Sequence, residues 1–370
     1  IDTLTAIDLP VTGDTILEVH IPSFRRDIEI REDIAEEVIR IVGFDKIPKN
    51  TMITFGKVTT LPQNDMKIRK IKDYFIACGF DEAVNISFLS FDEICNLKTG
   101  AVPIPLLNPI TSNLTHLRPS LVPGLLHTAK SNFNIGLKDI RCFEIGNVYL
   151  KTPSAESIAE PLRIAGIVAG KVKNSDWRGE NRLFDYYDLK GIIEGFLDLA
   201  QSPNVRFRKM QNTSALLDEG SRIYFENNEI GIMGCMSNEV IDSFNLSKQL
   251  HIFEIDLEPV LHCLSFDYAF KELPKYPAVL RDLCLLVPNE ITHQQIKDTI
   301  INNSDGLVKT IQLFDTYQSE KISRDLRSFT YSLVFRSDSE TLNDETVNSK
   351  ITEIISRLSE TLGVRLRGEE

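Results

Sequence analysis

Several common functional patterns are missing from this chain of 370 residues. It has no run of about 18 apolar residues, the length that a membrane-spanning helix needs. None of its six cysteines forms a C-x-x-C pair, so neither a zinc ribbon nor a redox dithiol is predicted. Scattered single cysteines are typical of a reducing, cytoplasmic setting. The catalytic strings H-E-x-x-H and G-x-S-x-G are absent too, so we expect no site of those types and no membrane contact.

Positive charge is also scarce. The chain carries 41 Lys and Arg against 53 Asp and Glu, a net charge of -12. A protein held on nucleic acid by a broad basic surface carries the opposite sign, so any RNA contact is expected to be local. The length predicts two or three domains. The chain begins at Ile1 rather than Met and shows no signal-peptide pattern, so we expect a piece of a longer protein.

One stretch looks superficially like a phosphate-binding loop. It runs from Gly166 through Gly170 to Lys171 and Val172. It has one residue too few between the glycines, and Val172 offers no hydroxyl for magnesium. We therefore predict a core strand here rather than a nucleotide site.

Hydrophobic periodicity predicts a helix at the end of residues 1–48, with acids in its first turn and Gly43 at its C-terminal end. Residues 49–63 are interpreted as a linker. In residues 64–265 helices and strands do not alternate strictly, which favours a mostly antiparallel α+β sheet. The predicted helices are 66–78, 117–131 and 188–200. The predicted strands are 83–88, 140–150, 162–172, 221–226, 229–236 and 251–257, with a tight turn at Asn227-Asn228.

Residues 272–370 show the clearest pattern. Strands are predicted at 282–288, 307–314, 328–336 and 364–367, and helices at 292–302 and 344–362. Asn343 is placed to cap the last helix and Gly363 to end it. The order β-α-β-β-α-β predicts a ferredoxin-like, split β-α-β domain.

Three groups of motifs together resemble the β subunit of bacterial phenylalanyl-tRNA synthetases. Residues 22–27 and 43–48 resemble the end of its winged-helix-like domain. The strings at 107–110, 117–126 and 143–146 resemble its class-II-synthetase-like module, and those at 275–282, 313–317 and 341–345 resemble its C-terminal anticodon-binding domain. The resemblance implies these domains at 1–48, 64–265 and 272–370, joined by the linker at 49–63.

The resemblance also implies an activity. The family attaches phenylalanine to its tRNA using ATP, as an (αβ)₂ heterotetramer in the cytoplasm whose α subunit carries the reaction. The class-II-like module keeps the fold without the chemistry. In agreement, the glycine-rich stretch 231–239 lacks the arginine of the class II G-x-G-x-x-E-R string. This piece is expected to be inactive alone. It also lacks the family's upstream half, so no editing activity is expected.

One departure from the family concerns the class-II-like module. Family members often carry a His-Pro-Gly-Arg-Ser-like string and a later His-Pro there. Here Asp218–Ser221 and Ser237-Asn238 stand in those places. The fold prediction is unaffected, but no role of those family residues is carried over.

An acidic cluster is the metal candidate. Asp33, Glu36 and Glu37 stand at i, i+3 and i+4 on one helix face, and Asp27 precedes them in an extended segment. Carboxylate-only ligation suits Mg²⁺. Alternatively, acids in a first helical turn simply favour the helix dipole in solvent. The resemblance implies that these four residues are Mg²⁺ ligands near the α subunit, where an isolated piece need not show the ion.

The RNA candidates are Asp315, Tyr317 and Ser328. A tyrosine on a sheet can stack a splayed base while a nearby carboxylate or hydroxyl reads its edge. Without the resemblance, Tyr317 is as well explained as an ordinary half-buried strand residue. The resemblance implies contact of these three positions with the tRNA anticodon. Arginines at 324, 327, 336, 365 and 367 are candidates for phosphate contacts, although residues 272–370 hold 12 Lys and Arg against 16 Asp and Glu.

The resemblance favours a noncatalytic tRNA-binding and assembly part of a ligase. Two other interpretations remain open at this point: a free-standing tRNA-binding or scaffold module, and an enzyme in its own right. The apolar faces around Leu117–His127 fit either an α-subunit interface or plain core packing.

Overall fold

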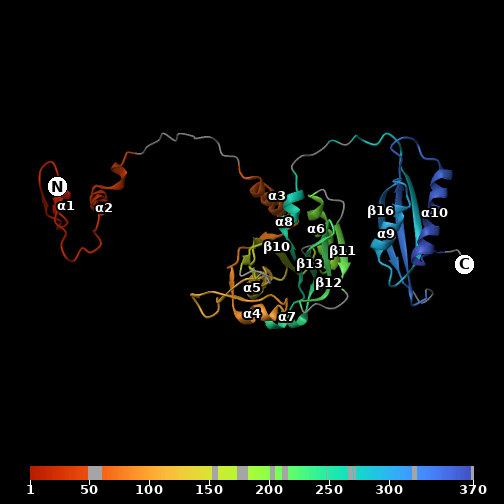
Figure 1. The fold of residues 1–370 in the computed structure, drawn as a ribbon, viewed down its shortest axis with the longest axis horizontal. Coiled ribbons are helices and arrows are strands. Elements are labelled where there is room, and N and C mark those ends of the chain that lie inside the picture. The colour runs from red at the N-terminus through yellow and green to blue at the C-terminus, as the bar shows by residue number, and fades with distance from the viewer. Residues whose placement is uncertain are drawn as a thin grey trace. The chain divides into compact units, whose positions relative to one another are not determined.

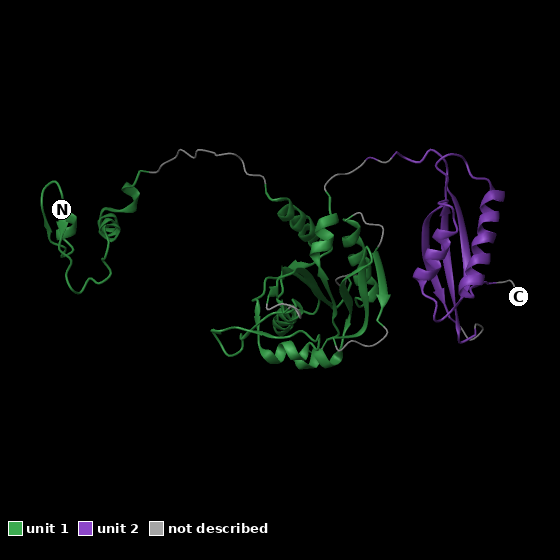
Figure 2. Cartoon of the chain, in the orientation of Figure 1, with its two compact units in different colours: residues 1–265 green, residues 266–370 purple. Residues whose placement is uncertain are grey.

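The computed structural model describes residues 1–48, 61–151, 157–172, 182–200, 205–210, 216–246, 248–265, 270, 272–318 and 323–367. They fall into two compact units, residues 1–265 and 266–370 (Figure 2). Most of the predicted linker, residues 49–60, lies outside the described residues. Among the described helices, none combines the length and apolarity needed to cross a membrane.

The N-terminal segment is a small motif around its own apolar cluster. Its elements are α1 (Asp2–Thr5), the antiparallel pair β1 (Val11–Thr12) and β2 (Glu18–Val19), α2 (Arg31–Val42) and the 3₁₀ turn η1 (Phe44–Lys46). Leu4, Leu9 and Ile28 are buried against the apolar side of α2. Gly43 ends α2 with a φ of 99°, a value that glycine adopts without strain. The predicted helix and its glycine end are confirmed.

A seven-stranded sheet forms the middle of the chain (Figure 1). Its order is β11-β12-β13-β14-β10-β7-β3, and every neighbouring pair is antiparallel except β3 with β7. The predicted antiparallel α+β sheet is therefore confirmed. The strands are β3 (Asp81–Glu82), β7 (Ile140–Asn147), β10 (Leu162–Ala169), β11 (Val205–Lys209), β12 (Leu217–Phe225), β13 (Asn228–Met236) and β14 (His251–Asp256). Gly166 lies within β10, in agreement with a core strand rather than a phosphate loop.

Helices cover both faces of this sheet. One face packs against α3 (Gln63–Ala77), α6 (Tyr186–Asp198) and α8 (Leu257–Cys263). The other packs against α5 (Val122–Asn134) and α7 (Asn238–Ser243). Short elements complete the unit: α4 (Phe91–Asn96), the three-stranded sheet of β4 (Phe88–Leu89), β6 (His116–Leu117) and β5 (Ile104–Pro105), and the pair β8 (Leu150–Lys151) and β9 (Ile158–Ala159).

Three local predictions were wrong. The helix predicted at 117–131 begins only at Val122, because His116–Leu117 pairs with β4 and β5 as strand β6. Residues 83–87 do not form the predicted strand, because the backbone N–H of Asn85 donates to the Glu144 carboxylate (3.3 Å) instead of to a strand ladder. The turn after β12 is made by Glu226 and Asn227, whose φ angles are 51° and 78°. A two-residue hairpin of this kind needs positive φ at both central positions, so the turn lies one residue earlier than predicted.

The C-terminal unit has the predicted β-α-β-β-α-β order. It consists of β15 (Val279–Pro288), α9 (His293–Asn302), β16 (Val308–Tyr317), β17 (Leu326–Phe335), α10 (Asp344–Leu362) and β18 (Arg365–Leu366). The antiparallel sheet runs β16-β17-β15-β18. Asn343 Oδ1 accepts a hydrogen bond from the Thr346 N–H (2.8 Å), and Gly363 ends α10 in the left-handed conformation, as predicted.

Phe75 on α3 offers a test of the core of the first unit. Its ring is fully buried and stacks between Phe143 and Phe253, at centroid distances of 5.4 and 5.3 Å. We expect Phe75→Ala to lower the free energy of unfolding by roughly 3–5 kcal/mol, because the cavity removes contacts to several rings at once. Urea unfolding followed by circular dichroism measures it. Ile76→Ala is the control, since Ile76 is the next residue and 53% exposed. An equal loss of unfolding free energy in the two variants would contradict the placement of Phe75 in the core.

Candidate nucleic-acid interface

One face of the C-terminal sheet is not covered by the helices of its own unit. The side chains of Phe329, Tyr331 and Leu333 on β17 enter the core that α9 and α10 also line. Alternate residues of a strand point to opposite faces, so Ser328, Thr330 and Ser332 lie on the other side. We call this side the open face. Its polar stripe on β17 indicates a surface that meets solvent or a partner rather than a second apolar layer.

The open face brings together the three residues predicted for RNA contact. Tyr317 is the cross-strand partner of Ser328, and Asp315 is the partner of Thr330. An irregularity of register between Leu313 and Asp315 makes this possible. Leu313 packs towards the core, and the extra residue puts Asp315 and Tyr317 onto the open face. Asp315 is exposed and Tyr317 is 46% exposed, so both are accessible.

Ser328 differs from its two neighbours because it is almost fully buried, at 1% exposure. Its hydroxyl shares a hydrogen bond with the Cys284 thiol, at an Oγ–Sγ distance of 3.4 Å. The Thr330 hydroxyl donates to the same sulfur at 3.7 Å. Ser328 therefore lies on β17 between Tyr317 of β16 and Cys284 of β15, as part of the floor of the open face.

Cys284 was not identified from the sequence as part of this surface. Burial acts to raise the pKa of its thiol, but hydrogen bonds from Ser328, Thr330 and Arg367 outweigh it, so the pKa lies below its ordinary value. The alternation of Leu283, Cys284 and Leu285 on β15 was the available signal, because it places the thiol opposite to the core leucines.

The five candidate arginines are not equivalent. Arg327 donates from Nη2 to the Ile291 carbonyl (2.7 Å) and packs over the Phe329 ring, so it serves the core side of the sheet. Arg367 follows β18 and places its guanidinium carbon 5.5 Å from the centre of the Tyr317 ring. Within the described part of the chain, none of the five candidates pairs with a carboxylate; they are Arg324, Arg327, Arg336, Arg365 and Arg367.

The acidic cluster at α2 is largely engaged by other groups. Arg25 pairs with both Asp27 (2.7 Å) and Glu37 (2.9 Å). Arg40 also pairs with Glu37 (2.5 Å), and these two arginines hold the pKa of the Glu37 carboxyl below its usual range. Hydrogen bonds from the Arg25 guanidinium likewise lower the pKa of Asp27.

The other two acids of the cluster behave differently. The Asp33 carboxylate accepts hydrogen bonds from the backbone N–H of Ile30 (2.9 Å) and Glu29 (2.8 Å), which lower its pKa and fix the start of α2. Glu36 is exposed and has no hydrogen-bond or ion-pair partner among the described residues. The described residues contain no group of three or more acids, histidines or cysteines that could hold an ion. By itself, this arrangement does not fit a metal site, although its oxygen donors suit Mg²⁺ chemically.

Buried carboxylates in the middle of the chain have structural partners. Glu254 accepts hydrogen bonds from the Ser120 hydroxyl (2.9 Å) and the Leu121 N–H (2.7 Å), and Arg163 pairs with it at 3.2 Å. Desolvation nevertheless raises the pKa of Glu254. These bonds fix the segment that leads into α5.

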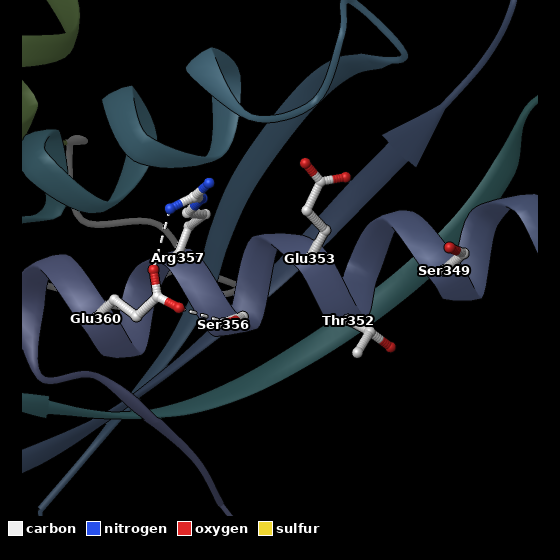
Figure 3. A pocket seen from close by; sticks show the side chains of 6 residues that line it. All are labelled: Ser349, Thr352, Glu353, Ser356, Arg357 and Glu360. Atoms are coloured by element: carbon white, nitrogen blue, oxygen red, sulfur yellow. Dashed lines mark hydrogen bonds and ion pairs between the residues drawn. The ribbon is translucent and has the colours of Figure 1, made fainter.

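A hollow of about 550 Å³ lies along α10 of the C-terminal unit (Figure 3). All its lining residues come from that one helix, from Ser349 to Glu360. Arg357 pairs with Glu360 (3.1 Å), and the Ser356 hydroxyl donates to the same carboxylate (3.2 Å). Within the described residues its charged groups are paired, Arg357 with Glu360 and Glu353 with Lys350, and no other element lines it, so we assign it no binding role.

The low pKa of Cys284 leads to a testable pH dependence. We expect the midpoint of its alkylation rate against pH to lie below that of the same thiol in the denatured chain, because hydroxyl and guanidinium donors stabilise the thiolate. Ser328→Ala removes one donor and should raise the midpoint, whereas Ser332→Ala, on the same face without that contact, should not. Iodoacetamide labelling quantified by mass spectrometry of the Cys284 peptide measures both. A native midpoint at or above the denatured one would contradict the geometry.

Three family models match successive parts of the chain. The tRNA synthetase B5 domain matches residues 1–44, the phenylalanyl tRNA synthetase beta chain CLM domain matches 47–257, and the ferredoxin-fold anticodon binding domain matches 274–367. The second covers more than half of the chain. A solved pyrrolysyl-tRNA synthetase from Desulfitobacterium hafniense matches with a TM-score of 0.44 and 15% identity, over 54% of this chain and 68% of that one, which is too weak to define the fold.

Curated relatives match along almost the whole chain. The phenylalanine–tRNA ligase β subunit of Geobacillus kaustophilus is 30% identical over 99% of this chain and 46% of its own length. That of Clostridium acetobutylicum is 29% identical over 96% and 44%, and that of Dehalococcoides mccartyi is 32% identical over 93% and 42%. The chain spans about half the length of the curated relatives it matches. It belongs to the phenylalanyl-tRNA synthetase β chain family.

Proposed function

We propose that the chain is a noncatalytic part of the β subunit of phenylalanine–tRNA ligase. In this proposal the ligase attaches phenylalanine to its tRNA using ATP, as an (αβ)₂ assembly in the cytoplasm. Residues 1–48 end a winged-helix-like domain, residues 64–265 form a class-II-like module that supports the α subunit, and residues 272–370 contact the tRNA anticodon. The observation that carries the RNA role is the open face, where Asp315 and Tyr317 are exposed side by side in the domain matched as ferredoxin-fold anticodon binding.

The chemistry of the open face suits a single-stranded anticodon. The Tyr317 ring can stack one unpaired base, a contact worth about 1–3 kcal/mol. The Asp315 carboxylate can accept hydrogen bonds from the N–H groups of a base edge. Ser328 is buried and its hydroxyl is bonded to the Cys284 thiol, so its role would be to hold the floor of the open face beside Tyr317. Because the unit is acidic overall, we expect one weak, specific contact within a larger tRNA interface.

The α-subunit surface is not at the leucines of α5. Leu125 and Leu126 are buried in the module's own core, which favours the packing interpretation for this helix. Leu107 and Ile110, in contrast, are 98% and 89% exposed. Large apolar side chains exposed together are typical of partner contacts, so we propose that this loop faces the α subunit.

A free-standing tRNA-binding or scaffold module is the alternative function. The two differ in one property: a ligase part binds a phenylalanyl-tRNA synthetase α subunit, and a free-standing module does not. Co-purification of the tagged chain with an α subunit separates them. The family membership and the exposed Leu107 and Ile110 favour the ligase part.

Removal of the Tyr317 ring tests the anticodon contact. We expect Tyr317→Ala to weaken binding of phenylalanine tRNA by the whole ligase about 5- to 150-fold, the equivalent of a lost base stack of ~1–3 kcal/mol. Fluorescence anisotropy with labelled tRNA measures the affinity. Tyr187→Ala is the matched control, because Tyr187 is a 76% exposed tyrosine of the other unit. Binding by Tyr317→Ala that equals wild type would remove the basis of the proposal.

We also propose that Mg²⁺ is held at Asp27, Asp33, Glu36 and Glu37 only within the assembly. Magnesium keeps several waters and uses one or two carboxylates, so ligands from outside the chain must complete the site. Glu36 is the acid open to the ion, since the other three are engaged by arginines or by the backbone.

Manganese soaking tests this metal proposal. In crystals of the αβ assembly we expect an anomalous peak beside Glu36 and Glu37, and none in crystals of the chain alone. Glu36→Gln should remove the peak, whereas Glu32→Gln, on the same helix but paired with Arg31, should keep it. An assembly without a peak at this position would exclude the site.

A further inference from the structure

Arg365 and Arg367 are cations that lie together at one edge of the C-terminal sheet. Several other cations of this unit are paired with acids: Arg281 with Asp344, Lys309 with Asp338, Lys350 with Asp305 and Glu353, and Arg357 with Glu360. Arg365 and Arg367 have no carboxylate partner within the described residues; Arg365 begins the short strand β18 and Arg367 follows its end. An acidic unit therefore keeps two unneutralised guanidinium groups at one edge of its sheet.

The backbone directs Arg367 onto the open face. β18 pairs with β15, and the Arg367 N–H donates to the Cys284 carbonyl (2.8 Å). Its side chain reaches the Cys284 thiol and ends over the Tyr317 ring, 5.5 Å from the ring centre. Tyr317 belongs to β16 at the opposite edge, so the two side chains extend towards each other and meet over the open face. The guanidinium thus occupies space beside the ring, where a base would stack.

Two interactions compete for that space. A guanidinium over an exposed tyrosine forms a cation–π contact, which is weaker than the stack of a base on the same ring. A base that takes the ring displaces the guanidinium, which remains tethered at β18 and has no acid of its own to return to. Its planar, bidentate donors match a phosphate, and the base brings its own phosphate to the same place.

We infer that Arg367 is a positioning residue for the anticodon base: it covers the Tyr317 ring in the free protein, yields the ring to the base and then binds that nucleotide's phosphate. The inference rests on the proposed function, because it needs an RNA base on Tyr317. Of the five candidate arginines, Arg367 is the one assigned to the Tyr317 ring. It also explains how an acidic unit attracts one nucleotide without a general RNA-binding surface.

Salt dependence of tRNA binding separates this role from a structural one. We expect Arg367→Ala in the whole ligase to weaken binding about 3- to 10-fold, and to reduce the slope of log affinity against log salt by about 0.7, the share of one single-strand phosphate. Arg367→Lys keeps a charge, so it should restore the slope but only part of the affinity. Arg357→Ala is the matched control, since it removes the same charge from the outer surface of α10. Circular dichroism should show all variants folded, because the Arg367 side chain is exposed.

The outcomes distinguish the inference from the function on which it rests. If Tyr317→Ala weakens binding and Arg367→Ala changes neither affinity nor slope, the inference is wrong and the anticodon contact stands. Weaker binding by Arg367→Ala with an unchanged slope would show a structural role, and would also overturn it. If Tyr317→Ala binds like wild type, the anticodon proposal fails, and the inference fails with it.

Discussion

One-sided burial of the C-terminal sheet is the constraint on which its proposed role depends. The helices α9 and α10 cover a single face, so every second residue along β17 and the later part of β15 enters the core, while β16 shifts its alternation at two irregularities. The alternate residues are thereby fixed on the other face, whatever their chemistry. Because Phe329, Tyr331 and Leu333 must enter the core, Ser328 and Thr330 must lie on the open face. The strand neighbours Asp315 and Tyr317 are held at fixed spacing by the same register.

The middle of the chain follows a different constraint. Its sheet is covered on both faces, so the acids inside it must find partners. Glu144 is held by Arg118 (2.6 Å) and the Asn85 side chain (2.7 Å), and Glu254 by Ser120, Leu121 and Arg163. These bonds tie loops and the start of α5 to central strands. They account for the buried charges by packing, without any demand for a reaction.

The sequence predicted local features well and long-range ones poorly. Periodicity, the Asn343 cap and the Gly363 end were enough to predict the ferredoxin-like order, because each acts within a few residues. The strand predicted at 83–88 failed because a carboxylate about sixty residues away, Glu144, takes the Asn85 N–H. The irregularity before Asp315, the burial of Ser328 and the reach of Arg367 to Tyr317 all depend on strand pairing, which periodicity does not specify.

In the proposed RNA role, the acidity of the C-terminal unit contributes to selectivity. Attraction to phosphates is independent of sequence, so a basic sheet would hold any RNA. A unit with more acidic than basic side chains weakens that general attraction, and the proposed stack on Tyr317 and edge contact of Asp315 would then decide which base is accepted. Specificity is a difference between affinities, and lowering the affinity for wrong partners raises it as surely as adding contacts. The role proposed for Arg367 is compatible with this, because its guanidinium would bind a phosphate only where the Tyr317 ring already holds a base.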